Sequence, residues 1–157
     1  MVTDTDGVSI VTLHADCVPI FMADRKKRVV AAGHAGWKGT YRQIVVKMLR
    51  RMNECFGSAY EDILVGIGPH IRSCCFEVKR DVADPFTGRF GDGVVEERGG
   101  KLFVNLQDVL LGDLARAGVP AENVTCADLC THCEEDLFYS HRRDNGQTGA
   151  MGAFIAL

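Results

Sequence analysis

The chain has 157 residues, with a hydrophobic content of 46%, a charged content of 25% and a formal net charge of -3. This length and composition are typical of one globular domain with a sizeable core. The small negative charge and the dispersed basic residues argue against a nucleic acid partner, and no apolar run is long enough to span a membrane.

The first quarter of the chain is predicted to form a β-hairpin. Residues 9–22 and 28–33 have strand-like sequences separated by a polar turn. If residues 25–26 form the centre of that turn, Cys17 lies directly opposite His34. Their Cβ atoms would then be about 5 Å apart, so one metal ion or one hydrogen bond could join them. A slip of one residue in the turn would place the two side chains on opposite faces.

The rest of the chain alternates between helical and strand-like patterns. A helix is expected over residues 41–54, with Thr40 as its N-cap and Gly57 as its end. The mixture is not a regular βαβ repeat, and it predicts an α+β fold with antiparallel pairs. The other expected elements are strands over 63–67, 75–78, 102–104, 124–127 and 150–157, helices over 79–86 and 107–117, and a loop or irregular hairpin over 87–100.

The cysteines indicate a reduced, cytoplasmic setting, because their odd number and scattered spacing differ from those of a secreted disulfide scaffold. The segment from Cys126 to Cys133, which includes Cys130, resembles half of a metal knuckle, but the adjacent pair Cys74 and Cys75 has the wrong spacing for the other half. The pattern therefore favours buried, inert cysteines. The seven cysteines are Cys17, Cys55, Cys74, Cys75, Cys126, Cys130 and Cys133.

Two segments could bind an anion. Residues 33–39, which include Lys38, form a glycine-rich turn ahead of a helix and could offer backbone N–H groups to phosphate, although a packing corner with Trp37 in the core is favoured. Arg142 and Arg143 could clamp a phosphate or carboxylate, or could form a solvated edge.

Four blocks of residues, in this order along the chain, closely resemble the laccase-domain family. Members of that family are described as multicopper polyphenol oxidases and as purine nucleoside phosphorylases with adenosine deaminase activity. The blocks are residues 15–19 (Ala-Asp-Cys-Val-Pro), residues 34–39 (His-Ala-Gly-Trp-Lys-Gly), residues 66–78 (with Gly-Ile-Gly-Pro and Cys-Phe-Glu-Val) and residues 138–143 (Phe-Tyr-Ser-His-Arg-Arg).

The resemblance implies a layered α/β/β/α arrangement with mixed, largely antiparallel sheets, and one laccase-like domain over residues 1–157. It also implies zinc, held by a His–Cys–His set in which Cys17 and His34 match the second and third ligands. The first histidine of that set lies in a segment upstream of the first block, so this chain resembles the C-terminal part of a longer member. Asp16, the third candidate catalytic residue, is expected to orient a neighbouring group rather than bind the metal.

The activity implied by the resemblance is phosphorolysis of adenosine, inosine, guanosine and methylthioadenosine, together with deamination of adenosine. Purine nucleosides and phosphate are then the partners, with Arg142, Arg143 and Lys38 as candidate phosphate ligands, and a homo-oligomer stays open. Copper is not expected, because the five histidines do not form the paired runs that multicopper centres use.

Two alternatives stay open at this point. In the first, the protein is a metal-free hydrolase or deamidase in which Cys17 is the nucleophile and His34 its general base. In the second, the chain is a non-catalytic, truncated laccase-domain module that binds a partner or dimerises through an exposed apolar patch.

Overall fold

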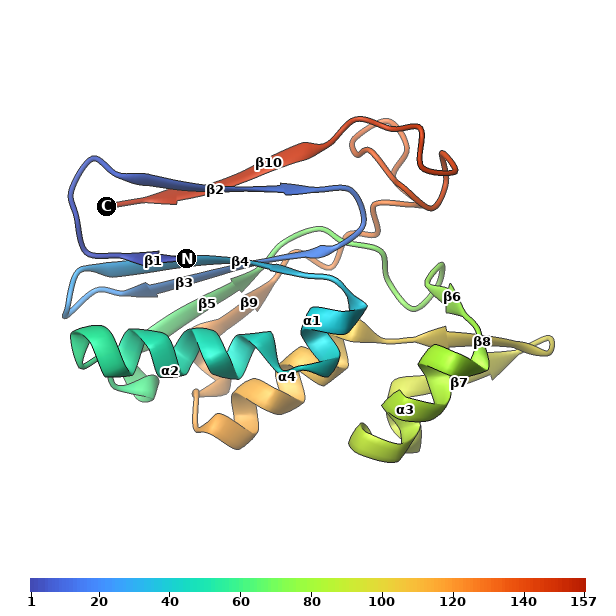
Figure 1. Ribbon diagram of the computed structural model, residues 1–157, viewed down its shortest axis with the longest axis horizontal. Coiled ribbons are helices and arrows are strands. Elements are labelled where there is room, and N and C mark those ends of the chain that lie inside the picture. The colour runs from blue at the N-terminus through green and yellow to red at the C-terminus, as the bar shows by residue number, and fades with distance from the viewer.

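The computed structural model describes residues 1–157, which form three sheets and four α-helices (Figure 1). The helices are α1 (Trp37–Tyr41), α2 (Ile44–Phe56), α3 (Arg80–Phe90) and α4 (Leu106–Ala117). The strands are β1 (Val2–Thr3), β2 (Ser9–His14), β3 (Val18–Asp24), β4 (Val29–Ala35), β5 (Ile63–Ile67), β6 (Glu77–Val78), β7 (Val95–Arg98), β8 (Lys101–Val104), β9 (Val124–Cys126) and β10 (Met151–Ala156). Short 3-10 helices cover Tyr60–Asp62, Asp92–Val94 and Ala121–Asn123.

The central sheet has five strands in the order β1-β4-β3-β5-β9, and only its β5–β9 pair is parallel. Helices α2 and α4 lie along one side of this sheet, and the two-stranded sheet β2–β10 lies along the other (Figure 1). The three-stranded sheet β6-β8-β7 and α3 extend from one end. This arrangement confirms the predicted α+β class with mixed, largely antiparallel sheets.

The core lies between the central sheet and the two long helices. Helix α2 buries Val45, Leu49 and Met52 completely, which is the apolar stripe predicted from its spacing. Gly33 of β4 lets this helix approach closely, because a Cβ there would lie 2.4 Å from the sulfur of Met48. None of the four helices has both the length and the hydropathy needed to cross a membrane.

The outer face of the β2–β10 sheet is apolar and exposed. Val11, Leu13 and Phe154 are 52%, 64% and 73% exposed, and the register pairs Phe154 with Val11 across the two strands. The opposite face of β2 is covered, since Ile10 and His14 are buried. The layer therefore has one packed side and one solvent-facing apolar side.

The predicted strand over residues 9–22 is divided into β2 and β3, which belong to different sheets. The chain turns at Asp16, whose φ of 81° lies in the left-handed region that a strand does not use. Periodicity could not reveal this turn, because the residues on both sides of it are apolar and strand-forming.

The predicted register of the hairpin is wrong by two residues. Val18 pairs with Ala35, so Pro19 rather than Cys17 lies opposite His34. The turn is longer than the prediction assumed: the Asp24 carboxylate accepts hydrogen bonds from the backbone N–H groups of Lys26 and Lys27. Because the register differs from the prediction by two residues, the side chains keep the predicted faces of the sheet. Cys17 lies directly before Val18, the first residue of β3.

Most other predicted elements are present with shifted ends. Gly57 ends α2 in a left-handed conformation as expected, but Thr40 is buried inside α1 and the N-cap of α2 is Gln43. Helix α3 continues to Phe90, into the region predicted as an irregular hairpin, and that hairpin is formed by β7 and β8.

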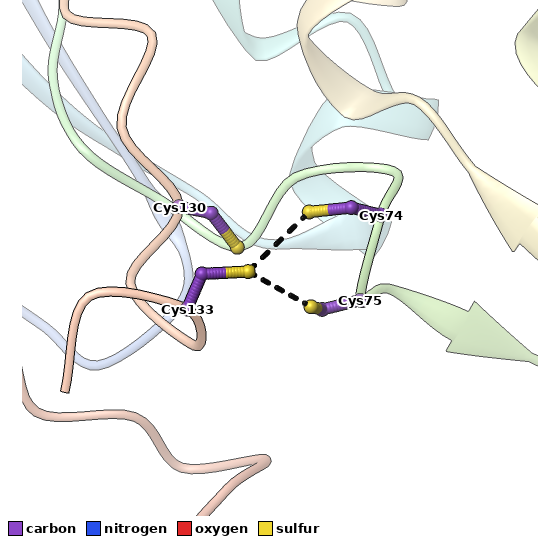
Figure 2. Close-up of side chains that lie close together, drawn as sticks. All are labelled: Cys74, Cys75, Cys130 and Cys133. Carbon is purple, nitrogen blue, oxygen red and sulfur yellow. Dashed lines mark hydrogen bonds between the residues drawn. The ribbon is translucent and has the colours of Figure 1, made fainter.

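Two loops far apart in the sequence, residues 68–76 and residues 127–133, lie side by side. The backbone N–H of His70 donates a hydrogen bond to the Leu129 carbonyl at 3.3 Å, and the His70 carbonyl accepts one from the Thr131 N–H at 3.1 Å. These contacts bring four thiols together (Figure 2). The prediction that these cysteines are buried is wrong, since only Cys130 is buried, while Cys74 and Cys133 are exposed. No sequence spacing could indicate this pairing, because it depends on how the two loops meet.

Candidate functional site

The turn between β2 and β3 forms one wall of a cavity of about 400 Å³. Because the two strands separate into different sheets at this point, the residues between them face a gap that neither sheet fills. The other walls come from the start of α1, from the loop of residues 68–76, from the first residue of α4 and from the segment before β10. The lining residues are Ala15, Asp16, Cys17, Gly36, Trp37, Ile71, Phe76, Leu106, His141 and Arg142.

Cys17 lines this cavity and is partly buried. A Cβ at Gly36 would lie 3.1 Å from the Cys17 sulfur, so glycine at this position leaves space beside the thiol. Burial raises the pKa of the Cys17 thiol above its ordinary value, and the adjacent Asp16 carboxylate raises it further. Without a cationic partner, the thiol is therefore protonated at neutral pH.

His34 lies near the end of β4 with an exposed side chain. Its Nδ1 bonds to the Leu13 carbonyl oxygen at 2.9 Å, and because a carbonyl only accepts, Nδ1 carries the proton. The other ring nitrogen, Nε2, is then unprotonated in the neutral ring and available to accept a proton or bind a metal. This orientation by a backbone carbonyl is the one that metal-binding histidines commonly have.

His14 stacks on His34, with ring centroids 4.7 Å apart and planes inclined by 17°. Its Nδ1 donates to the Cys17 carbonyl at 3.1 Å, and its Nε2 accepts from the Thr12 hydroxyl at 2.7 Å. Burial lowers the pKa of this imidazole, so it stays neutral. Both ring nitrogens of His14 therefore have hydrogen-bond partners within the protein.

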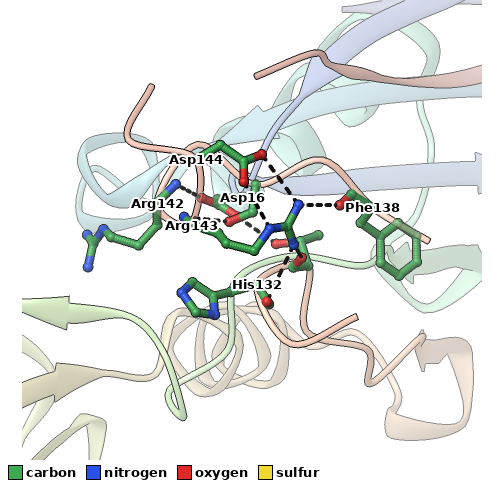
Figure 3. A network of polar contacts seen from close by, with 8 residues as sticks. Asp16, His132, Phe138, Arg142, Arg143 and Asp144 are labelled. Atoms are coloured by element: carbon green, nitrogen blue, oxygen red, sulfur yellow. Dashed lines mark hydrogen bonds and ion pairs between the residues drawn. The ribbon is translucent and has the colours of Figure 1, made fainter. Parts of the chain in front are cut away.

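Asp16 connects three segments around the cavity (Figure 3). Its carboxylate accepts a hydrogen bond from the Thr131 hydroxyl at 2.7 Å and another from the Arg142 backbone N–H at 2.7 Å. Its backbone carbonyl accepts a third from the Ile71 N–H at 2.9 Å. This placement suits the expected role of orienting neighbouring groups.

Arg143 lies in the centre of the same network (Figure 3), and its guanidinium is already fully occupied. Nε and Nη2 donate to Asp144, Nη1 donates to the carbonyls of Thr131 and His132, and Nη2 also donates to the carbonyl of Phe138. A guanidinium has five N–H donors, so none is left for phosphate. In this structure Arg143 holds the segment before β10 in place, and its phosphate role stays a prediction that would require some of these bonds to break.

Arg142 and Lys38 keep their cationic groups accessible. The Arg142 guanidinium lies 5.3 Å from the Phe76 ring centroid and donates one bond, from Nη1 to the Glu77 carbonyl at 2.6 Å. The Lys38 ammonium lies 5.3 Å from the ring centroid of Trp37, whose side chain lines the cavity, while Lys38 itself does not. Arg142 is therefore the better placed of the two cations.

Replacing Arg142 and Arg143 separately is expected to lower the free energy of unfolding by different amounts. Arg143→Ala leaves up to three carbonyl oxygens without donors and should lower the free energy of unfolding by about 3 kcal/mol. Arg142→Ala removes a mostly exposed guanidinium and should leave the stability nearly unchanged. Urea denaturation of both variants tests this difference, and equal losses would contradict the structural role of Arg143.

The cavity residues that were not predicted as site residues include two aromatic side chains and a histidine: Trp37, Phe76 and His141. Trp37 was expected to fill the core, yet it is 37% exposed and lines the cavity. Its position directly after a glycine, at the start of a short helix, was the available signal. His141 precedes the predicted arginine pair, but sequence alone does not show that its side chain faces the cavity.

The family model described as multi-copper polyphenol oxidoreductase laccase matches residues 1–157, the whole of the chain. The chain belongs to this laccase family. Two solved structures with the same fold are YlmD from Geobacillus stearothermophilus and YfiH from Bacillus licheniformis, with TM-scores of 0.92 and 0.93 at 37% sequence identity. They match 99% of this chain and 59% and 60% of their own lengths.

Curated members of the laccase family that are similar to this chain are named purine nucleoside phosphorylases. One, from Clostridium acetobutylicum, is 36% identical over 99% of this chain and 65% of its own length. Another, YlmD from Bacillus subtilis, is 36% identical over 99% of this chain and 57% of its own length. The chain therefore spans about three fifths of the length of these relatives.

Proposed function

We propose that this chain carries the cavity in which a laccase-family purine nucleoside phosphorylase binds and cleaves its substrate. The observation that supports the proposal is the composition of the cavity, in which the Cys17 thiol and the Arg142 guanidinium share a space with Trp37 and Phe76. Aromatic walls suit the flat purine, since stacking on a base contributes about 1–3 kcal/mol. The names of the curated relatives point to the same chemistry.

Zinc is the metal that we propose for Cys17 and His34. A thiolate and an imidazole are ligands that zinc prefers, and the bond from His34 Nδ1 to the Leu13 carbonyl leaves Nε2 free to coordinate. The high pKa of the buried Cys17 thiol is compatible with this role, because a coordinated thiol is deprotonated by the metal. When bound, zinc would act as a Lewis acid and lower the pKa of a water molecule. Copper, which the family description names, is less suited to this thiol–imidazole pair in a chain with five histidines.

The proposed reaction is phosphorolysis of a purine nucleoside. A phosphate oxygen forms a bond to C1′ of the ribose while the bond from C1′ to the purine nitrogen breaks, and the purine leaves with the bonding electrons and takes up a proton. Arg142 would bind the phosphate through the guanidinium N–H groups that the Glu77 carbonyl does not use. His141 lies in the same cavity and would donate a hydrogen bond to the departing purine. Lys38, at the edge of the cavity beside Trp37, would add positive electrostatic potential.

The substrates that we propose are adenosine, inosine, guanosine and methylthioadenosine, with deamination of adenosine as a second reaction. Asp16 would act by holding Arg142 through its backbone N–H rather than by contacting the substrate. A phosphorylase requires phosphate and a deaminase requires only water, so the two reactions are separable.

The metal-free hydrolase is the weaker alternative. A cysteine nucleophile needs its thiolate, yet burial and Asp16 raise the pKa of Cys17. The orientation of His34 does not distinguish the two alternatives, because its free Nε2 could either accept a proton or bind a metal.

The experiment is an assay of the zinc-loaded protein with adenosine, with and without phosphate, and chromatography of the products. Adenine that forms only with phosphate is the expected result, and inosine in both samples would add the deaminase. Absence of both products would contradict the proposal. That outcome would favour the non-catalytic module, for which the exposed outer face of β2–β10 is the candidate contact surface.

A further inference from the structure

We propose that Cys74, Cys75, Cys130 and Cys133 form a second, structural zinc site that joins the two loops beside the cavity. The four sulfur atoms all lie within 4.8 Å of one another, although they come from two loops more than fifty residues apart in sequence (Figure 2). The site is separate from Cys17 and His34 and does not depend on the proposed function.

The distances between the sulfurs fit a tetrahedral site better than a disulfide. A zinc ion with Zn–S bonds of about 2.3 Å requires sulfurs about 3.8 Å apart at the corners of its tetrahedron. The Cys133 sulfur lies 3.8 Å from that of Cys74 and 3.4 Å from that of Cys75. A disulfide needs about 2.05 Å, so these thiols would have to move closer together to form one.

Both loops present their cysteines from tight turns. Cys133 N and Glu134 N donate to the Cys130 carbonyl at 3.1 and 3.0 Å, which places the two cysteines of this Cys-x-x-Cys segment on one side of the turn. This is the ligand spacing of a zinc knuckle. In the other loop, Cys75 N and Phe76 N both donate to the Arg72 carbonyl at 2.9 Å. The two turns therefore hold the cysteines close together even without a bound metal.

The surroundings also favour negative charge on one of the four sulfurs, that of Cys130. The Arg72 backbone N–H donates to the Cys130 sulfur at 3.4 Å, as N–H groups do to metal-bound thiolates. Two guanidinium groups bind carbonyls next to the cysteines: Arg98 donates to Ser73, and Arg143 donates to His132 at 3.4 Å. Because these guanidinium groups also pair with Glu96 and Asp144, they neutralise little of the charge that four thiolates around zinc would carry.

The position of the cluster explains what such a metal would do. Cys75 immediately precedes Phe76, which lines the cavity, and Cys133 lies in the segment that Arg143 ties to the Asp16 network. Zinc would therefore fasten together the loop that carries Phe76 and the segment that leads to His141 and Arg142.

The first experiment titrates cobalt(II) into the metal-free, reduced protein in which Cys17 and His34 are both replaced by alanine. One cobalt per chain is expected, with tetrahedral ligand-field bands and a thiolate-to-metal charge-transfer band of about four times the intensity given by one thiolate, as four ligands require. Zinc should then displace the cobalt. A protein that binds no cobalt, or binds it without these bands, would overturn the proposal.

The second experiment measures zinc content and melting temperature in variants of the same protein that carries Cys17→Ala and His34→Ala, so that zinc can be held only by the cysteine cluster. Cys133→Ser should lose the bound zinc and lower Tm by at least about 5 °C relative to the zinc-loaded parent, whereas the matched control Cys55→Ser, at the exposed end of α2, should retain both. Chelation of the parent should lower Tm to the same degree without any mutation, which guards against a variant that fails to fold. The proposal would be contradicted if Cys133→Ser retained zinc. It would also be contradicted if two cysteines of the cluster were found joined by a disulfide under reducing conditions.

Discussion

Replacing Cys17 by alanine is expected to lower kcat/KM for nucleoside phosphorolysis by more than about 100-fold, since even partners of metal ligands contribute 10- to 100-fold. The thiol lies in the cavity wall and is the only cysteine among the lining residues. Its loss should also remove one bound zinc, measured by metal analysis after dialysis. Activity and metal are expected to fall together, because both depend on the same sulfur.

The matched control for this variant is Cys55→Ala. Cys55 is an exposed cysteine in the last turn of α2, outside the cavity, and its replacement should change neither activity nor zinc content. Both variants should melt within a few degrees of the parent. Full activity in a folded Cys17→Ala protein would refute the proposed site.

Replacing Asp16 by alanine is expected to lower the free energy of unfolding by about 4 kcal/mol, because hydrogen bonds to a charged acceptor contribute about 1.5–3 kcal/mol each. The variant loses the bonds from the Thr131 hydroxyl and the Arg142 backbone N–H. It also places alanine at a φ of 81°, where a side chain with a Cβ is strained and aspartate is better tolerated.

Two further substitutions test the explanation for Asp16. Asp16→Asn keeps one oxygen acceptor and the tolerance for positive φ, so its loss should be about half as large. Asp6→Ala removes an exposed carboxylate paired with Arg28 and should change stability by less than about 1 kcal/mol. Urea denaturation of the three variants gives the order, and equal stability of Asp16→Ala and Asp6→Ala would contradict the role assigned to Asp16.

The sequence predicted the existence and type of most elements, because periodicity and glycine signals report local structure. Strand β5 and the helices α2 and α4 were found within a few residues of their ends. The division of the first strand was not predicted, since the turn at Asp16 is stabilised by Thr131, Ile71 and Arg142 from distant parts of the chain. Local patterns carry no information about such partners.

The site was predicted in part for the same reason. Cys17 lies in the cavity wall, and the expected proximity of His34 to the first strand is realised through Leu13 rather than through direct pairing with Cys17. The two arginines look equivalent in the sequence, but only the structure shows that Arg143 has no free donor and that Arg142 does. The metal roles of Cys17 and His34 stay predictions.

The β2–β10 sheet joins segments that are separated by residues 15–150. Strand β2 pairs with no other strand. Its backbone hydrogen bonds can therefore form only after nearly the whole chain has been synthesised and β10 has reached its position. Pairing between such distant segments closes a long loop and is slow. Leu13, whose carbonyl fixes the tautomer of His34, belongs to β2. During folding, the geometry of this histidine should therefore be among the last features to form, after the central sheet and its helices.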